Sequence, residues 1–145
     1  MRADDFPPIA DDIHEVWSRF PSWDQDTNMN LHMGFIVEEI RTGYSRLRMP
    51  LKPEIMQPAG IMHGGAIASL IDTAVVPAIG AVGIEPTRMV TVSMNINFMG
   101  AISDEDAVCE GWITRQGRSI IFCSAEVTGA QSGKVCATGT LVYKV

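Results

Sequence analysis

Hydrophobic and polar residues alternate strictly between residues 90 and 98. Valine, methionine, isoleucine and phenylalanine occupy the even positions, and threonine, serine and asparagine occupy the odd positions. A period of two residues is typical of a β-strand with one buried face and one face exposed to water. Three more strand-like runs follow, separated by glycine-containing turns that suit antiparallel hairpins, at about 106–116, 119–128 and 134–145.

The stretch from Gly64 to Ile84 has a different character. Its 21 residues contain a single ionisable side chain, Asp72, and most of the others are Ala, Ile, Leu and Val. A segment of this length can be a transmembrane helix, but a carboxylate near the middle, Pro77 and glycines at both ends disfavour that interpretation. A helix that is apolar on nearly all sides is otherwise buried inside a globular protein. We therefore expect a long buried helix and no membrane span.

Shorter elements precede this helix. Apolar residues at helical spacing between Ile13 and Phe20 follow the acidic pair Asp11-Asp12, which predicts a short amphipathic helix ended by Pro21. A polar loop and then two strands joined by a turn are expected after it, at 22–30, 33–40 and 44–51.

The sum of these elements is two strands, one long helix and four further antiparallel strands. One sheet buries such a helix most simply by wrapping around it, while a second subunit closes the open side. The sequence therefore predicts an α+β fold. A chain of 145 residues has room for one domain, which we expect to span 1–145, with an N-terminal helix and loop at 1–32 and the core at 33–145.

Charge and composition narrow the range of partners and cofactors. A formal net charge of −6 and the lack of a basic run disfavour binding to nucleic acid. The three cysteines lack a C-x-x-C spacing, and the three histidines include no i, i+4 pair. We therefore expect reduced, packed thiols, no metal site and no cofactor. The acidic N-terminus does not resemble a secretory signal, which predicts a cytoplasmic protein.

The residues at the start of the long helix suggest an oxyanion site. Two glycines in His63-Gly64-Gly65 allow the backbone amides of a helix N-terminus to approach a ligand oxygen. Attack on a thioester places negative charge on the carbonyl oxygen, and preorganised amides stabilise that charge by roughly 3 kcal/mol. Paired glycines at a helix start also occur for packing alone, so the motif by itself does not define a ligand site.

Asp72 is the candidate catalytic carboxylate. A carboxylate in such apolar surroundings costs on the order of several kcal/mol unless it is compensated, so a functional role explains it better than a structural one. At about 1.5 Å per residue, roughly 11 Å of helix separate it from the glycine pair. If two such helices pack antiparallel across a two-fold axis, Asp72 of one chain approaches His63 and Gly64 of the other. A dimer then carries two composite sites.

The combined motif resembles the phenylacetate-pathway-like (PaaI-like) branch of the hotdog-fold thioesterases, within the 4-hydroxybenzoyl-CoA thioesterase superfamily. That branch has Asn or Gln six residues before His-Gly-Gly and Asp or Glu nine residues after the His, as Gln57, His63 and Asp72 are spaced here. The likeness extends to Gly60 and to two later segments, VTVSMNINFMGAI at 90–102 and RQGRSIIFCSAEV at 115–127. It implies a hotdog fold, in which an antiparallel sheet wraps around a long central helix, and a homodimer that pairs into a homotetramer.

The resemblance also implies an activity, the hydrolysis of acyl-CoA to a free acid and CoA without a cofactor. Gly64 and the helix N-terminus would polarise the thioester carbonyl, with His63 and Gly65 supporting the same end of the site. Asp72 of the facing subunit would activate water as a general base, or would attack directly to give a transient anhydride.

Further site residues follow from the same resemblance. Gln57 would orient water or the acyl carbonyl, and Thr91 would position the water. The turn Gly117-Arg118-Ser119 would lie along the pantetheine arm and phosphates of CoA, where Arg118 can offer its planar fork of donors to phosphate. An ordinary solvated turn arginine is an equally good interpretation. Methionine and aromatic side chains either line the acyl pocket or belong to the core, namely Trp17, Phe20, Trp23, Met56 and Met62.

The sequence leaves two alternative functions open. A hydroxyacyl-CoA dehydratase of the same fold needs a histidine and a carboxylate that are both placed for proton transfer, and the segment from Gln57 to Asp72 resembles that pattern less. A non-catalytic acyl-CoA binding module keeps the pocket without hydrolysis, and the intact Asp72 argues against it.

Overall fold

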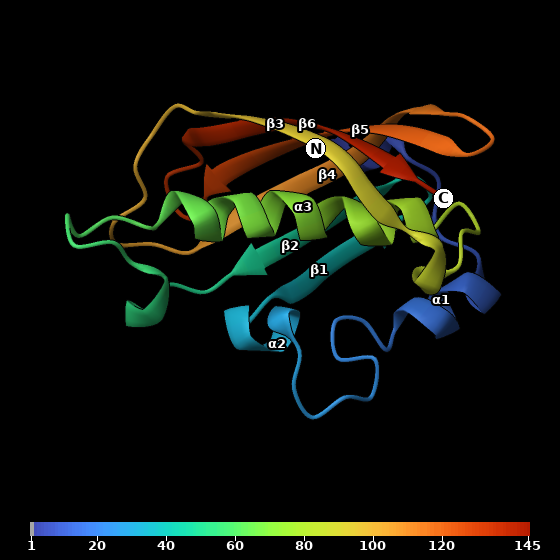
Figure 1. The fold of residues 1–145 in the computed structure, drawn as a ribbon, viewed down its shortest axis with the longest axis horizontal. Helices are drawn as coiled ribbons and strands as arrows, with labels where there is room; N and C mark the ends of the chain where they lie inside the picture. The colour runs from blue at the N-terminus through green and yellow to red at the C-terminus, as the bar shows by residue number, and fades with distance from the viewer. Residues whose placement is uncertain (1) are drawn as a thin grey trace.

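The computed structural model describes residues 2–145, in which six antiparallel strands form one sheet that packs against a long helix (Figure 1). The spatial order of the strands is β1-β2-β4-β5-β6-β3. Their bounds are β1 Ile36–Arg41, β2 Tyr44–Met49, β3 Val90–Phe98, β4 Ala107–Gln116, β5 Ile120–Gly129 and β6 Val135–Lys144. This architecture confirms the predicted α+β class, with a sheet around a central helix.

The long helix is α3 (Gly64–Gly80), and it lies across one face of the sheet (Figure 1). Two glycines on the strands beneath it allow the close approach. A Cβ at Gly111 would lie 2.9 Å from the backbone of Ala74, and a Cβ at Gly139 would lie 2.8 Å from a methyl carbon of Ile71. Since protein interiors are close-packed, side chains at these glycines would force the helix away from the sheet.

One side of α3 stays partly exposed in the single chain. Residues three or four apart share one face of a helix, and the partly exposed positions follow that spacing, at Ala68, Ser69, Asp72, Thr73 and Val76. The expectation of burial on all sides is therefore not met by one chain alone. The open side is the one that the sequence analysis assigns to a second subunit.

Strand β3 is an edge strand, and the prediction that one of its faces is buried is wrong for the single chain. Large apolar side chains remain exposed, with fractions of 62% for Val90, 59% for Val92 and 55% for Phe98. The physical reason is that β3 pairs only with β6, at the margin of the sheet. A register shift between Thr91 and Ser93 also breaks the alternation, because a bulge turns the following side chains to the other face.

The N-terminal third contains two short helices. Helix α1 (Asp11–Trp17) confirms the predicted short helix, but it ends at Trp17 and turns follow it, so Pro21 is not what ends it. Helix α2 (Met29–Met33) replaces the end of the expected loop and the start of the expected strand. The Asn28 side chain accepts a hydrogen bond from the amide of Leu31, and Gly34 ends α2 with a left-handed φ of 78°, so the strand begins only at Ile36. Three single turns of 3-10 helix complete the structure, η1 Arg2–Asp5, η2 Pro53–Ile55 and η3 Pro86–Arg88.

Aromatic side chains from the end of α1 and the turns after it pack over the C-terminal end of α3. Trp17, Phe20 and Trp23 lie with ring centroids 5.1 to 5.9 Å apart. The Trp17 ring fills the space that a Cβ at Gly80 would need. The structure thus favours the core interpretation for Trp17 and Phe20, both of which are buried. Within residues 2–145, no helix has both the length and the apolarity required to cross a membrane.

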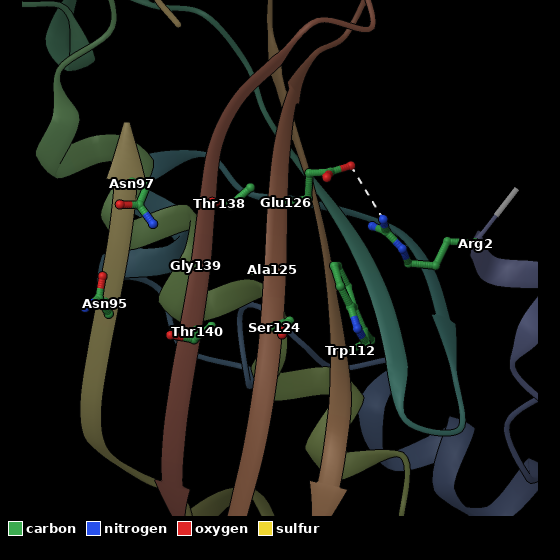
Figure 2. A pocket seen from close by; sticks show the side chains of 10 residues that line it. All are labelled: Arg2, Asn95, Asn97, Trp112, Ser124, Ala125, Glu126, Thr138, Gly139 and Thr140. Carbon is green, nitrogen blue, oxygen red and sulfur yellow. Dashed lines mark ion pairs between the residues drawn. The ribbon is translucent and has the colours of Figure 1, made fainter. Parts of the chain in front are cut away.

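The face of the sheet opposite α3 carries mostly polar side chains. A hollow of about 270 Å³ lies there, and short polar side chains of β3, β5 and β6 line it (Figure 2). At its margin the Arg2 guanidinium lies 3.9 Å from the ring centroid of Trp112 and pairs with Glu110 and Glu126, at 3.1 and 3.6 Å. These contacts hold the N-terminal turn η1 on this outer face, away from the open side of α3.

Candidate functional site

The two oxygens of the Asp72 carboxylate differ in their hydrogen bonding. Its Oδ1 accepts hydrogen bonds from the Thr91 hydroxyl at 2.9 Å and from the Tyr143 hydroxyl at 2.7 Å. The Tyr143 oxygen also lies 2.8 Å from the backbone carbonyl oxygen of Asp72. No donor among residues 2–145 bonds to Oδ2. One oxygen is therefore held in place, while the other is available on the partly exposed side of α3.

Strand pairing brings the two hydroxyls to the same carboxylate. Thr91 on β3 and Tyr143 on β6 are direct cross-strand partners, and such partners project from the same face of a sheet. That face is the one covered by α3. The pair comes just before the register shift in β3, so the bulge decides that Thr91 rather than Val92 or Ser93 faces the helix.

Tyr143 is a site residue that the sequence analysis missed. Burial, together with the nearby charge of Asp72, raises the pKa of the Tyr143 hydroxyl well above its ordinary value. The hydroxyl therefore stays protonated and remains a donor throughout the working pH range. A usable signal existed, since a tyrosine on the inward face of a strand needs a partner for its hydroxyl. The identity of that partner depends on a contact between residues 71 positions apart.

The N-terminus of α3 offers one unused backbone amide. His63 is the N-cap, and its Nδ1 accepts a hydrogen bond of 2.8 Å from the amide of Gly65. The amide of Ala66 donates to the His63 carbonyl oxygen at 2.9 Å. The amide of Gly64 donates to no group in the part of the chain that the structure describes. Because Nδ1 is an acceptor, the neutral His63 ring carries its proton on Nε2, so both free donors at this end are Gly64 N–H and His63 Nε2–H.

A cavity adjoins this helix end. Its volume is about 190 Å³, and side chains from α2, η2 and α3 line it, among them Met33, Ile55, Ala66 and Ser69. The other predicted residue nearby is Gln57, which begins a tight turn before α3, with its backbone amide bonded to the Ile61 carbonyl oxygen at 2.8 Å.

The turn at Gly117-Arg118-Ser119 lies at the other end of the site. It joins β4 to β5 and is exposed. The Ser119 carbonyl oxygen accepts a hydrogen bond from the amide of Val145, two residues after Tyr143, so the turn belongs to the Asp72 end of the sheet. No carboxylate within residues 2–145 pairs with Arg118.

The structure thus divides the predicted site residues into two groups. Asp72 and Thr91 are in contact, with the exposed turn at the same end of the sheet. His63, Gly64 and Gly65 form the other group, at the helix N-terminus. Roughly 11 Å of α3 lie between the two groups, at about 1.5 Å per residue. Within one chain they do not meet.

The three cysteines do not contribute a nucleophile. All three are free and buried, which confirms the expectation of packed thiols. Burial raises the pKa of the Cys123 thiol to about 12 and also raises that of Cys109 and Cys136. Since the thiolate is the reactive form, Asp72 is the better candidate for the reacting group.

Comparison with known proteins identifies the class. The thioesterase superfamily model matches residues 59–136, which is more than half of the chain. The chain therefore belongs to the thioesterase superfamily.

Individual relatives agree with this assignment. Human acyl-coenzyme A thioesterase 13 is 33% identical over 97 residues, which cover 63% of this chain and 65% of that protein. The match thus spans slightly less than two thirds of that relative's length. The E. coli PaaI protein of the phenylacetic acid degradation operon superposes with a TM-score of 0.78 at 18% identity, over 90% of this chain and 93% of that one. The conserved protein PA5202 of Pseudomonas aeruginosa gives 0.75 at 26% identity, over 86% and 98%. These likenesses confirm the predicted hotdog fold, and the family match confirms the predicted thioesterase superfamily.

Proposed function

We propose that the protein hydrolyses acyl-CoA thioesters to a free acid and CoA, at a site shared by two copies of the chain. The observation that carries the proposal is the Asp72 carboxylate, with Oδ1 anchored by two hydroxyls and Oδ2 left free. A carboxylate in this state can take a proton from water or attack a carbonyl. The similarity to acyl-coenzyme A thioesterase 13 supports acyl-CoA as the substrate class.

The difference between the two edge strands of the sheet supports pairing with a second copy of the chain. Strand β1 is protected as an edge, because it carries charged residues and a bulge and because Pro8 bridges to Arg41. Strand β3 has nine residues with no charge and no proline. A long, uncharged edge with exposed apolar side chains is a template for pairing with another strand. Pairing of β3 with β3 of a second copy would continue the sheet and bury those side chains.

This pairing would also complete the site. A two-fold axis beside β3 would turn the open sides of two α3 helices toward each other. Asp72 of one chain would then face the free amide of Gly64 in a partner subunit, which the length of the helix forbids within one chain. Pairing of two such dimers into a homotetramer, and a cytoplasmic location, stay predictions.

The reaction would proceed through a tetrahedral intermediate. The thioester carbonyl oxygen would accept hydrogen bonds from Gly64 N–H and His63 Nε2–H of one chain, which stabilise the charge that develops there. Oδ2 of Asp72 from the partner subunit would take a proton as the water oxygen bonds to the acyl carbon. The carbon–sulfur bond then breaks, and the CoA thiolate leaves and is protonated. Direct attack by Oδ2 would instead break the carbon–sulfur bond, release the CoA thiolate and form an anhydride, which water then cleaves to the free acid and the Asp72 carboxylate.

The remaining predicted residues have assigned places in this proposal. Arg118, which is exposed and without a carboxylate partner in residues 2–145, would contact the phosphates of CoA. Gly117 and Ser119 would follow the pantetheine arm. Thr91 would act through its hydrogen bond to Asp72, and Gln57 would reach the acyl carbonyl or the water from the turn before α3.

Release of free thiol from a series of acyl-CoAs tests the proposal. Short, medium, long and aryl acyl-CoAs would be incubated with the protein, and CoA would be read with a chromogenic disulfide. We expect turnover of at least one class. New enoyl absorbance from a 3-hydroxyacyl-CoA without thiol release would favour the dehydratase. Recovery of uncleaved acyl-CoA bound stoichiometrically to the protein would favour the binding module.

Met94→Lys is expected to separate the two copies and remove activity with them. Met94 lies on β3 and is 40% exposed in the single chain. An ammonium group buried there would cost on the order of 3 kcal/mol, about a hundredfold in the dissociation constant of the dimer. Light scattering coupled to gel filtration would report the mass, and thiol release would report the activity.

The matched control is Ile36→Lys, on the opposite edge. Ile36 is an exposed apolar residue of β1, with an exposed fraction of 49%. Both variants therefore replace an exposed apolar residue of an edge strand with lysine. We expect this variant to keep the mass and activity of the wild type. Equal loss of assembly in both variants, or a wild-type mass for Met94→Lys, would contradict pairing through β3.

A further inference from the structure

The chain contains two tyrosines, and both place a buried hydroxyl against a carboxylate. Tyr143 lies on the helix side of the sheet and bonds to Asp72 at 2.7 Å. Tyr44 bonds to Glu110 at 2.6 Å and stacks on Phe6 of the N-terminal segment, with ring centroids 5.2 Å apart. The two contacts have similar chemistry, but only one of them involves the open side of α3.

The contact made by Tyr143 fixes the orientation of the Asp72 side chain. Its hydroxyl oxygen lies within hydrogen-bond distance of both Oδ1 and the backbone carbonyl oxygen of Asp72. The carboxylate is therefore held to its own helix turn, and Thr91 binds the same oxygen from the neighbouring strand. Two hydrogen bonds to one oxygen fix the plane of the carboxylate, since rotation of the group away from this plane would break both. Oδ2 keeps its outward direction as a result.

We infer that Tyr143 is a positioning residue for hydrolysis, which aims Oδ2 of Asp72 at the substrate bound by the partner subunit. The inference rests on the proposed function and adds a residue to its site. Tyr143 is buried beneath α3, with an exposed fraction of 3%, so it acts through Asp72 and does not touch the substrate. Its position on the last strand ties the orientation of the carboxylate to the pairing of β6 with β3.

Tyr143→Phe tests the inference, with Tyr44→Phe as the matched control. We expect Tyr143→Phe to lower kcat by about ten- to a hundredfold, because a misdirected reacting group can cost about that much. KM should change by less than about twofold, since no substrate contact is removed. Tyr44→Phe loses an equivalent hydroxyl on the outer face, so kcat and KM should match the wild type.

A second measurement does not depend on turnover. The carboxyl carbon of Asp72 can be followed by ¹³C NMR, with its signal assigned by comparison with Asp72→Asn. Because the chemical shift of a carboxylate carbon responds to the donors bonded to its oxygens, the signal should move in Tyr143→Phe and stay in place in Tyr44→Phe. This readout separates the present inference from the proposed function, because it remains valid if the wild type hydrolyses no acyl-CoA.

The results that would overturn the inference are distinct. A wild-type kcat in Tyr143→Phe, beside an inactive Asp72→Asn, would leave the proposed function intact and reduce Tyr143 to a structural role. Equal losses of kcat in both tyrosine variants would assign the effect to stability. An unchanged Asp72 carboxyl signal in Tyr143→Phe would refute the contact as the orienting interaction, whatever the activity of the wild type.

Discussion

Asp72→Asn is expected to lower kcat for thioester hydrolysis by at least about a thousandfold, within the range found when a general base is removed. Asparagine has the same shape as aspartate, and its side-chain oxygen can still accept hydrogen bonds from Thr91 and Tyr143. The fold and assembly should therefore persist. The lost capacity is the uptake of a proton, or nucleophilic attack, at the position of Oδ2. Thiol release would measure kcat, and thermal melting and light scattering would verify the folded assembly.

Asp106→Asn is the matched control for this variant. Asp106 is also partly buried and accepts hydrogen bonds, from the amide of Leu51 at 2.9 Å and from Arg48 at 3.4 Å. It lies between β3 and β4, outside both groups of site residues. We expect some loss of stability and a wild-type kcat. If Asp72→Asn retained more than about a tenth of the wild-type kcat, the carboxylate would have no place in the chemical step, since a general base contributes at least about a hundredfold.

Gly64→Pro is expected to lower kcat by roughly a hundred- to a thousandfold, the usual effect of removing one oxyanion donor. Gly64 is the first residue of α3, where proline is well accepted. The preceding residue, His63, has φ −65° and ψ 134°, which is the conformation that a following proline requires. The substitution therefore removes the free N–H and leaves the helix and its N-cap in place.

Gly64→Ala separates the role of the amide from that of the glycine. It keeps the N–H, and the added Cβ would lie 3.5 Å from the Phe98 ring, an ordinary van der Waals distance. We expect activity near that of the wild type for alanine and a large loss for proline, with similar melting temperatures. Equal activity in the two variants would show that the Gly64 amide does not contact the reacting carbonyl.

The sequence predicts the central elements of this fold because their signals are local. The apolar run from Gly64 and the His-Gly-Gly motif before it locate α3, and the glycine turns locate the hairpins of β4, β5 and β6. Helix α2 was missed because its signals are single residues, the Asn28 cap and the left-handed Gly34, inside a segment that is otherwise polar. Such caps favour a short helix only when the rest of the chain packs against it.

The sequence is less informative about β3 and the detail of the site. Alternation in β3 identifies a strand with an apolar face, but it does not say which chain buries that face. The spacing of Gly64 and Asp72 predicts two separated groups, and the structure agrees. Neither the free amide of Gly64 nor the contact of Tyr143 with Asp72 can be read from spacing. The first depends on the Nδ1 cap of His63, and the second depends on the register between β3 and β6.

Mixed assemblies of Asp72→Asn and Gly64→Pro chains test most directly whether two copies share one hydrolytic site. Each variant alone should be almost inactive. Co-expression with two different affinity tags would allow purification of the mixed dimer. In that dimer one site combines both defects, while the other combines an intact Asp72 with an intact Gly64. We therefore expect about half of the wild-type rate of thiol release, as two-fold symmetry requires. A mixed dimer no more active than the two variants alone would contradict a shared site.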